Sequence, residues 1–351
     1  MALLLGCSGE EVSEGDVEPV EAVRANEHSA TVVEQTLNLK VEFPDDVKLT
    51  DASVIGTQTL TLKDRVTLTK AATSNRLLLS VGLDAKVGHL RGARAIQLKD
   101  RAKVTGNVTA GTTLTKGPGV VITGTGATNV AANLTEVAWQ RKAPEVSLGP
   151  ITLNAEERRF LEPGTYGNLT VRSRAKLTLT TGVYVFQNVL IEAQGELSLD
   201  SRLGPVQMFA KGTFNYRGSV ASLGVEMPQF IVGYLGTTAA LIEAPFTGAL
   251  IAPNADVRFQ AALPEGHRAF ILGKNVTLDA DTKILPYPVN WVSLVGPTQY
   301  EGPPDNTPTY TMPRAGEHPG DLDHRRPGDR RRREWRLERR GLGKRNGWQR
   351  R

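Results

Sequence analysis

Alternation of apolar and polar residues dominates the middle of the chain, from about Thr31 to Leu285. Runs such as TLTLKDRVTLT, which begins at Thr59, and GNLTVRSRAKLTLTTGVYVF, which begins at Gly167, place an apolar residue at nearly every second position. These runs are short and are broken by Gly, Asn, Asp or Lys. Such alternation is typical of strands with one buried face, and no long helical periodicity competes with it. The pattern therefore predicts an all-β protein of many short strands.

Internal repeats set the period of these strands. The sequence LKDR occurs twice, beginning at Leu62 and at Leu98, and intermediate copies of the unit can be placed at Val81 and Thr115, so that the spacings are 19, 17 and 17 residues. Three motifs of the second half recur after 18, 20 and 21 residues. They are Gly164-x-Tyr166 with Gly182-x-Tyr184, Leu177 with Leu197, and Asn254 with Asn275.

A unit of this length is too short for a propeller blade or an ankyrin repeat, and it suits one coil of a solenoid. Aliphatic residues of successive coils would stack inside, while Gly, Asn and Asp would form the corners. We therefore predict a right-handed parallel β-helix, or β-solenoid, built as two stacked blocks. A β-sandwich is the competing architecture, but it does not predict sequence repeats of near-constant length.

Changes in pattern suggest five segments along the chain. Residues 1–30 carry a lipobox and an acidic tether, 31–134 form the first β-helical block, 135–150 a junction, and 151–292 the second block; 293–351 is a Pro-rich linker with a disordered basic tail. In the junction, Trp139 could cap a stack of coils or contact a glycan, and capping is the favoured interpretation. The spacing of Asn154 and Glu157 predicts one short helical turn.

Cys7 is the one cysteine of the chain, so no internal disulfide forms. The residues Leu4-Leu5-Gly6 before it fit a bacterial lipobox, in which the cysteine is acylated and anchors the protein in a membrane. Seven acids against one Arg then follow between residues 8 and 30, which indicates a solvated tether. A secretory signal needs a longer apolar stretch and basic residues before the cysteine, so a free thiol is the alternative.

The net charge of +5 comes from the end of the chain. Residues 314–351 hold 14 Lys and Arg against 6 Asp and Glu, while the other 313 residues hold 28 basic and 31 acidic residues. The β-helical body is therefore mildly acidic, and the composition does not predict nucleic-acid binding. The basic tail could serve as an arm for anionic polymers or be an extension without a selected function; its dependence on Arg favours the second interpretation.

Two groups of motifs resemble known bacterial β-solenoid families. The stretch AKVTGNVTAG (102–111) resembles the coils of the bactofilins, a polymer-forming cytoskeletal family, in its small-x-Val-x-Gly-x-Val rhythm. LEPGTYGNLTV, FTGALIAPNADVRF and FILGKNVTLDADTKI are similar to secreted β-helical proteins that include ice-binding adhesin domains. These motifs span roughly 57–284 and describe how coils are built, so the resemblance implies the fold far more than the function.

Ice binding would need a flat, regular ladder of threonines on one face. Thr59, Thr61, Thr67 and Thr69 begin such a ladder, but LKDR interrupts it and the repeat around residues 95–104 replaces most of the threonines. Because threonine is also a good strand residue, we do not favour ice binding.

The candidate acids do not assemble a catalytic pattern. Asp64 and Asp100 would stack two coils apart, each beside an Arg, which indicates turn chemistry and a solvated ladder of ion pairs. Asp279 and Asp281 would share one face of a strand, without a third acid, His or Lys at an obvious spacing. The five histidines, His28, His89, His267, His318 and His324, form no HxH or HxxxH pair. The sequence predicts no catalytic residues, no metal site and no cofactor.

These observations predict a non-catalytic surface lipoprotein of a Gram-negative bacterium, outside the cytoplasm and held in the outer membrane or at the cell surface by lipid on Cys7. Its role would be structural, adhesive or glycan-contacting, with surface polysaccharide or self-association as possible partners. One alternative is a polysaccharide-acting β-helix enzyme, which clustered carboxylates or bound calcium on one face would support. A second alternative is a self-polymerising scaffold or ice-binding-like adhesin, and exposed apolar coil ends would support polymerisation.

Overall fold

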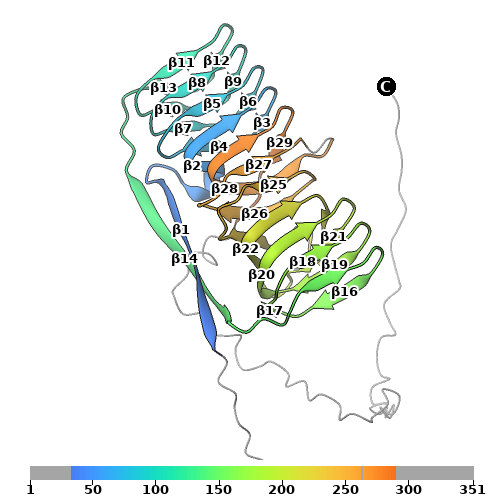
Figure 1. The fold of residues 1–351 in the computed structure, drawn as a ribbon. Coiled ribbons are helices and arrows are strands. Elements are labelled where there is room, and N and C mark those ends of the chain that lie inside the picture. The colour runs from blue at the N-terminus through green and yellow to red at the C-terminus, as the bar shows by residue number, and fades with distance from the viewer. Residues whose placement is uncertain (1–32, 262–263, 290–351) are drawn as a thin grey trace, which may run out of the picture. The chain divides into compact units, whose positions relative to one another are not determined.

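The computed structural model describes residues 33–261 and 264–289, and their regular structure is β-strand almost throughout (Figure 1). Within these ranges there is no α-helix, and the 3-10 turn η1 (Leu49–Asp51) is the one helical element. The strands stack in parallel coils and form a β-solenoid of about 12 turns, so the predicted fold class is confirmed.

The first block winds from Ala52 to Ala127 in coils that carry up to three short strands each. Each strand pairs with its equivalent in the next coil, as β5 does with β8 and β8 with β11. The strands are β2 (Ala52–Leu62), β3 (Thr67–Leu68), β4 (Ala71–Ser74), β5 (Leu79–Val81), β6 (Lys86–Val87), β7 (Leu90–Gly92), β8 (Ile96–Leu98), β9 (Lys103–Val104), β10 (Val108–Ala110), β11 (Leu114–Lys116), β12 (Val121–Ile122) and β13 (Gly126–Ala127).

The second block winds from Ile151 to Leu285, and its coils grow from 18 residues (Ile151 to Leu169) to 26 (Asn215 to Leu241) before they shorten to 17 (Ala240 to Val257). Buried aromatic rings fill these longer coils, among them Phe214, Tyr216 and Phe246. The strands are β15 (Ile151–Leu153), β16 (Arg158–Leu161), β17 (Gly164–Thr165), β18 (Leu169–Val171), β19 (Lys176–Thr180), β20 (Gly182–Ile191), β21 (Glu196–Asp200), β22 (Val206–Tyr216), β23 (Ser219–Ser222), β24 (Phe230–Tyr234), β25 (Ala240–Ile242), β26 (Thr247–Ala252), β27 (Val257–Phe259), β28 (His267–Leu278) and β29 (Lys283–Leu285).

The two blocks meet through their first and last coils. Strand β2, which opens the first block, pairs in parallel with β28 in the last coil of the second, and β3 pairs with β29 in the same way. In Figure 1 the blue strand β2 therefore lies beside the orange strands, which come last among the described residues. The stack runs from β15 to β29, continues at β2 and finishes at β13, so the order of coils in space differs from their order in sequence.

A two-stranded ribbon crosses the outside of the coils and carries the chain from one block to the other. β1 (Glu34–Pro44) pairs antiparallel with β14 (Leu134–Pro144) over all 11 residues. Every second side chain of the middle of β1 is buried, at Leu37, Leu39 and Val41, and Trp139 of β14 is buried with them. These side chains form a second apolar cluster on outward-facing residues of six coils. Those outward residues are Val185, Phe209, Ile231, Ala249, Ile251, Phe270, Leu272 and Ile55.

Trp139 therefore does not cap the end of a coil stack, and that prediction is wrong. Its ring is 2% exposed and lies 4.7 Å from the ring of Phe209, on the side of the solenoid. Gly233 leaves room for it, since a Cβ there would lie 2.9 Å from Trp139. The burial also removes Trp139 from the surfaces that a glycan could reach.

The stacked ladder that the LKDR repeat predicts is confirmed. Leu62 pairs in register with Val81, and Val81 with Leu98, and all three are buried. The ladder then continues at Lys116, one residue later than the repeat had placed it. Leu60, Leu79 and Ile96 form a parallel ladder two residues earlier.

Register in the second block confirms one of the three sequence repeats. Leu177 pairs with Leu197 as predicted. Gly164, however, pairs with Tyr184 rather than with Gly182. The repeat of Asn254 at Asn275 is likewise displaced, because the strands that follow pair Val257 with Val276. In both cases similar motifs occupy different places along the coil, so their spacing is not the coil length.

Candidate functional site

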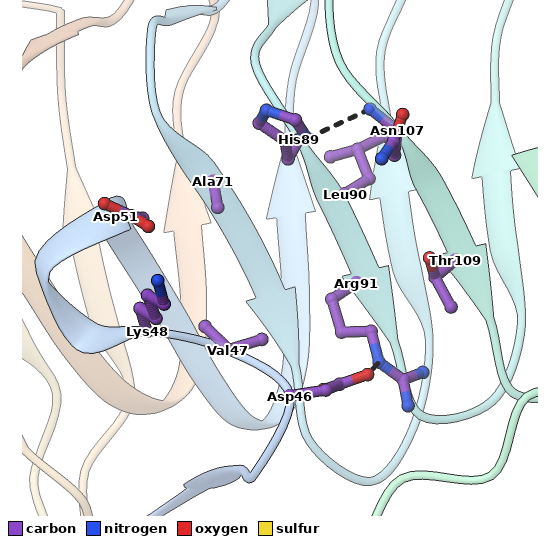
Figure 2. A pocket seen from close by; sticks show the side chains of 10 residues that line it. All are labelled: Asp46, Val47, Lys48, Asp51, Ala71, His89, Leu90, Arg91, Asn107 and Thr109. Atoms are coloured by element: carbon purple, nitrogen blue, oxygen red, sulfur yellow. Dashed lines mark hydrogen bonds and ion pairs between the residues drawn. The ribbon is translucent and has the colours of Figure 1, made fainter. Parts of the chain in front are cut away.

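A groove with polar walls lies where the chain passes from the ribbon to the first coil. The segment from Asp46 to Asp51 folds over the outer face of β4, β7 and β10 and leaves a cavity of about 360 Å³ (Figure 2). Its lining comprises Asp46, Val47, Lys48, Asp51, Ala71, His89, Leu90, Arg91, Asn107 and Thr109. Sequence reasoning missed this groove, because it depends on contact between a loop and a coil face that are distant along the chain.

Arg91 holds the groove together. It occupies an outward position in register with Thr73 and Thr109, yet it is only 5% exposed. Its Nε donates to Asp46 at 2.8 Å, and its two terminal nitrogens donate to the carbonyls of Gly92 and Ala131. A guanidinium suits this task because its donors spread in one plane. Arg91 thereby holds two segments against the coils, the loop at Asp46 and the chain at Ala131, and it balances the charge of Asp46.

His89 stands at the rim of the groove, at a corner of the solenoid. Its Nδ1 accepts a hydrogen bond from the backbone N–H of Asn107, one coil further on, at 3.0 Å. The side-chain oxygen of Asn107 in turn accepts from the N–H of Thr125 in the next coil. Gly106 makes this corner possible, since a Cβ there would meet the imidazole ring at 2.5 Å. The groove therefore offers hydrogen-bonding groups but no nucleophile with an adjacent base.

The acids Asp279 and Asp281 do not share a strand face, contrary to the prediction. Both follow the end of β28 and lie in a corner turn, closed by a hydrogen bond from the N–H of Thr282 to the carbonyl of Asp279 at 3.2 Å. Asp281 has φ of +65°. The turn points the two carboxylates at different cations of the neighbouring coils. Asp279 accepts from Lys63 at 2.7 Å and from Arg258 at 2.8 Å, and Asp281 forms a two-point pair with Arg65 at 2.7 Å.

These partners keep both acids ionised. Partial burial would raise the pKa of Asp279, but the hydrogen bonds from Lys63 and Arg258 outweigh it and hold the pKa below its usual value. The hydrogen bond from Arg65 lowers the pKa of Asp281. Neither group retains a proton near neutral pH, so neither serves there as the general acid that glycoside hydrolysis needs.

The predicted ladder of ion pairs at the corners exists, with different acids. Arg65 pairs with Asp281 and Arg101 pairs with Asp84, so charges of opposite sign alternate from coil to coil. Asp64 instead accepts a hydrogen bond from the backbone N–H of Leu83 in the next coil. Arg65, Asp84, Arg101 and Asp281 all have φ between +55° and +65°, so they occupy the same place in successive turns.

His267 is a structural residue. Its ring is fully buried, its Nε2 donates to the carbonyl of Gln260 at 2.7 Å, and its Nδ1 accepts from the N–H of Phe246 at 3.3 Å. Burial lowers its pKa, so the ring is neutral at pH 7. His28, His318 and His324 lie outside the described residues. Within the described ranges no three His, Cys, Asp or Glu residues come together as a set of metal ligands.

The threonines do not form the ladder that ice binding requires. Thr61 stacks on Thr277 in the coil below but on Ser80 and Gln97 in the coils above. Thr67 stacks on Lys86. The outward faces are therefore mixed in chemistry.

Comparison with known proteins leaves the family open. No protein-family model matches the chain, and no curated protein matches it. Among solved structures, the chain is similar to an ice binding protein from an Antarctic bacterium, Flavobacteriaceae. The match has 12% identity, covers 66% of this chain and 78% of that chain, and has a TM-score of 0.25.

Lipidation of Cys7, the acidic tether and the basic tail all lie outside the described residues and remain predictions, as does the resemblance to bactofilins. Among the described residues we find no helix with the length and apolarity that a membrane span requires.

Proposed function

We propose that the protein is a non-catalytic surface protein that contacts glycan through the outer faces of its coils. One observation carries this proposal: polar side chains stand in register on successive coils of a rigid stack. Thr277, Thr61, Ser80, Gln97 and Thr115 are aligned one above the other, and we refer to them as the polar ladder. All five side chains are at least partly exposed.

The polar ladder fits a hydroxyl-rich polymer. Neighbouring parallel strands lie about 4.8 Å apart, so the ladder offers a hydrogen-bonding group at each such step. Hydroxyl and amide groups both donate and accept, which matches the hydroxyls of a sugar chain. The fold also separates polar from apolar outer surface, since the ribbon β1–β14 covers apolar residues that face outward on six coils.

The paired acids support a role without catalysis. A β-helix enzyme acting on polysaccharide would need a carboxylic acid that keeps its proton, or several free carboxylates that hold calcium. Asp279 and Asp281 are instead each held by one or two cations.

Binding without cleavage tests this proposal. The full chain should sediment with at least one insoluble polysaccharide from a panel of neutral and acidic glycans, and no new reducing ends should appear. Gln97→Ala together with Ser80→Ala should weaken this binding, because both side chains leave the ladder. Release of reducing ends that Asp279→Asn abolishes would establish the enzyme alternative, and failure to bind any glycan would contradict the proposal.

The surface location is a separate proposal, supported by the lipobox around Cys7 and the acidic segment after it. We propose an outer-membrane or cell-surface lipoprotein of a Gram-negative bacterium. Mass spectrometry of the membrane fraction should find acyl chains on the Cys7 peptide, and Cys7→Ser should move the protein to the soluble fraction. An intact Met1 peptide in the soluble fraction would contradict it.

A further inference from the structure

A second outer face of the solenoid carries cations whose side chains make no ion pair or hydrogen bond in the described residues. This face is formed by β29, β3, β6, β9 and β12, which pair side by side in that order (Figure 1). One outward position of this face holds, coil after coil, Lys283, Thr67, Lys86 and Lys103. Arg268 pairs with Leu285, which is the next outward residue after Lys283. We call Arg268, Lys283, Lys86 and Lys103 the basic face.

Pairing distinguishes these cations from those at the nearby corners. Arg65 and Arg101, on the same coils, are each bound by an aspartate, whereas none of the four side chains of the basic face makes an ion pair or hydrogen bond within the described part of the chain. No acid occupies an outward position in register with Lys86 or Lys103, and Asp84, which Arg101 holds, interacts with Lys103 only at longer range. The aspartate nearest to Lys283 along the chain is Asp281, which Arg65 already holds.

Lys86 and Lys103 face each other directly across two paired strands. Paired parallel strands lie about 4.8 Å apart, and like charges in register destabilise a sheet. The corners of the same coils alternate in sign and avoid this repulsion. An external anion that lies over both lysines would relieve the repulsion and gain two charge-assisted contacts.

The arrangement favours an extended ligand. The cations are distributed along the stack on several coils. Arg268 lines a small described cavity beside Glu226, whereas the three lysines line none of the described cavities. A small anion would need donors that converge on one point, whereas a linear polymer can meet them in succession. Threonine hydroxyls stand among the cations. Thr67 lies in register with Lys86, and the exposed Thr69 and Thr105 follow β3 and β9, two coils apart.

We propose that the basic face binds an acidic polysaccharide, with sugar carboxylates over Lys86 and Lys103 and the polymer running across the coils. This inference rests on the proposed glycan-contacting function and specifies its ligand class and its surface. The acidic segment of the same chain, residues 8–30, is the other occupant that charge would allow, and the experiment separates the two.

The test measures binding of the full chain to immobilised polygalacturonate, with dextran as the neutral probe. Lys86→Gln with Lys103→Gln should weaken binding to polygalacturonate by about tenfold or more, because two contacts to carboxylate are lost. The matched control is Lys40→Gln with Lys142→Gln, which removes the same charge from the exposed side of the ribbon. The control should bind polygalacturonate as the unaltered protein does. Added salt should weaken the binding of both proteins.

Four results would overturn the inference. Equal loss in both variants would mean that net charge alone drives binding. Binding that the Lys86 and Lys103 changes leave intact would place the glycan elsewhere, for instance on the polar ladder, and the proposed function would survive. Binding that appears only after Glu10, Glu11 and Glu14 are changed to Gln would show that the chain's own acidic segment occupies the face. Absence of binding to every glycan probe would contradict the proposed function as well.

Discussion

Single residues at the corners turn each strand into the next. The corner that contains Asn154 and Glu157 shows how: the N–H of Asn154 donates to the Glu157 carboxylate at 2.9 Å, as at the start of a helix. Glu156 between them has φ of +67°, however, and the chain turns into β16. The predicted helical turn is therefore wrong although its hydrogen bond forms. The sequence could not show this, because a non-glycine residue with positive φ has no strong signature.

Gly233 is a residue whose lack of a side chain supports the packing of the ribbon. A Cβ at this position would lie 2.6 Å from the Phe209 ring and 2.9 Å from Trp139. Gly233→Ala should therefore lower the free energy of unfolding by roughly 1–3 kcal/mol, as overpacking does. Denaturant titration measures this. Gly126→Ala is the control, because its Cβ would make an ordinary contact at 3.7 Å; an equal effect of the two substitutions would contradict the account.

His267 should make stability depend on pH. Burial lowers its pKa in the folded state below the 6.5 of a free histidine, so the unfolded chain binds the proton more readily. The contribution of the neutral His267 ring to stability is therefore complete above about pH 6.5 and is lost as pH falls below that value. Unfolding free energies at about pH 7.5 and about pH 5.5 should differ less in His267→Gln than in the unaltered protein. The same difference in both proteins would show that the ring does not resist protonation.

At the scale of elements, the ribbon β1–β14 is the part that sequence analysis did not find. Leu37, Leu39 and Val41 alternate with polar residues just as coil strands do, so the pattern predicts a strand but not its partner. Alternation also cannot show that the coils carry a second apolar surface, because Val185 and Phe209 flank inward residues and read as continuous apolar runs. The ribbon becomes necessary only once these outward residues are known to need cover.

The ribbon should be held by its apolar side chains. Leu39 is fully buried between ribbon and coils, and Leu39→Ala should cost roughly 2–5 kcal/mol. Hydrogen exchange should then increase in β1 and β14 before it increases in the inner ladder. Lys40→Ala, at the next position on the exposed side, should change stability by no more than about 0.5 kcal/mol. Similar losses in the two variants would mean that the ribbon is not packed as described.

At the scale of the whole molecule, the inward positions could be predicted and the order of the coils could not. The repeat places Leu62, Val81 and Leu98 in one ladder because neighbouring coils of the first block are also neighbours in sequence. The contact of Leu60 with Val276 joins residues 216 apart, and alternation carries no information about that pairing. The polar ladder and the basic face both cross this junction, so neither could be recognised without the structure.

Both ends of the stack place a cation where inner coils have leucine. Lys116 continues the ladder of Leu98 at one end, and Arg159 lies in register with Leu177 at the other. Both side chains are exposed at these end coils, and charges at such positions on edge strands oppose edge-to-edge pairing. The protein should therefore not polymerise through its coil ends.

Removing these end charges tests that expectation. Lys116→Leu with Arg159→Leu should produce head-to-tail association, measured by sedimentation velocity. Lys40→Leu with Lys142→Leu, the same change on the ribbon, should not. If the Lys116 and Arg159 variant sediments as the unaltered protein does, the charges do not prevent association of the coil ends. Polymers of the unaltered protein would support the scaffold alternative.

The stacking of the last coil on the first is the central claim, and a disulfide across that junction tests it most directly. Thr61 and Thr277 are in register and outward-facing, at a strand spacing of about 4.8 Å that allows a disulfide. In a Cys7→Ser background, Thr61→Cys with Thr277→Cys should form an intramolecular disulfide on mild oxidation, seen by peptide mass spectrometry. Thr61→Cys with Thr115→Cys, three coils apart, should not. A disulfide only in the second pair, or in neither, would contradict the single stack of coils on which the proposed glycan surfaces depend.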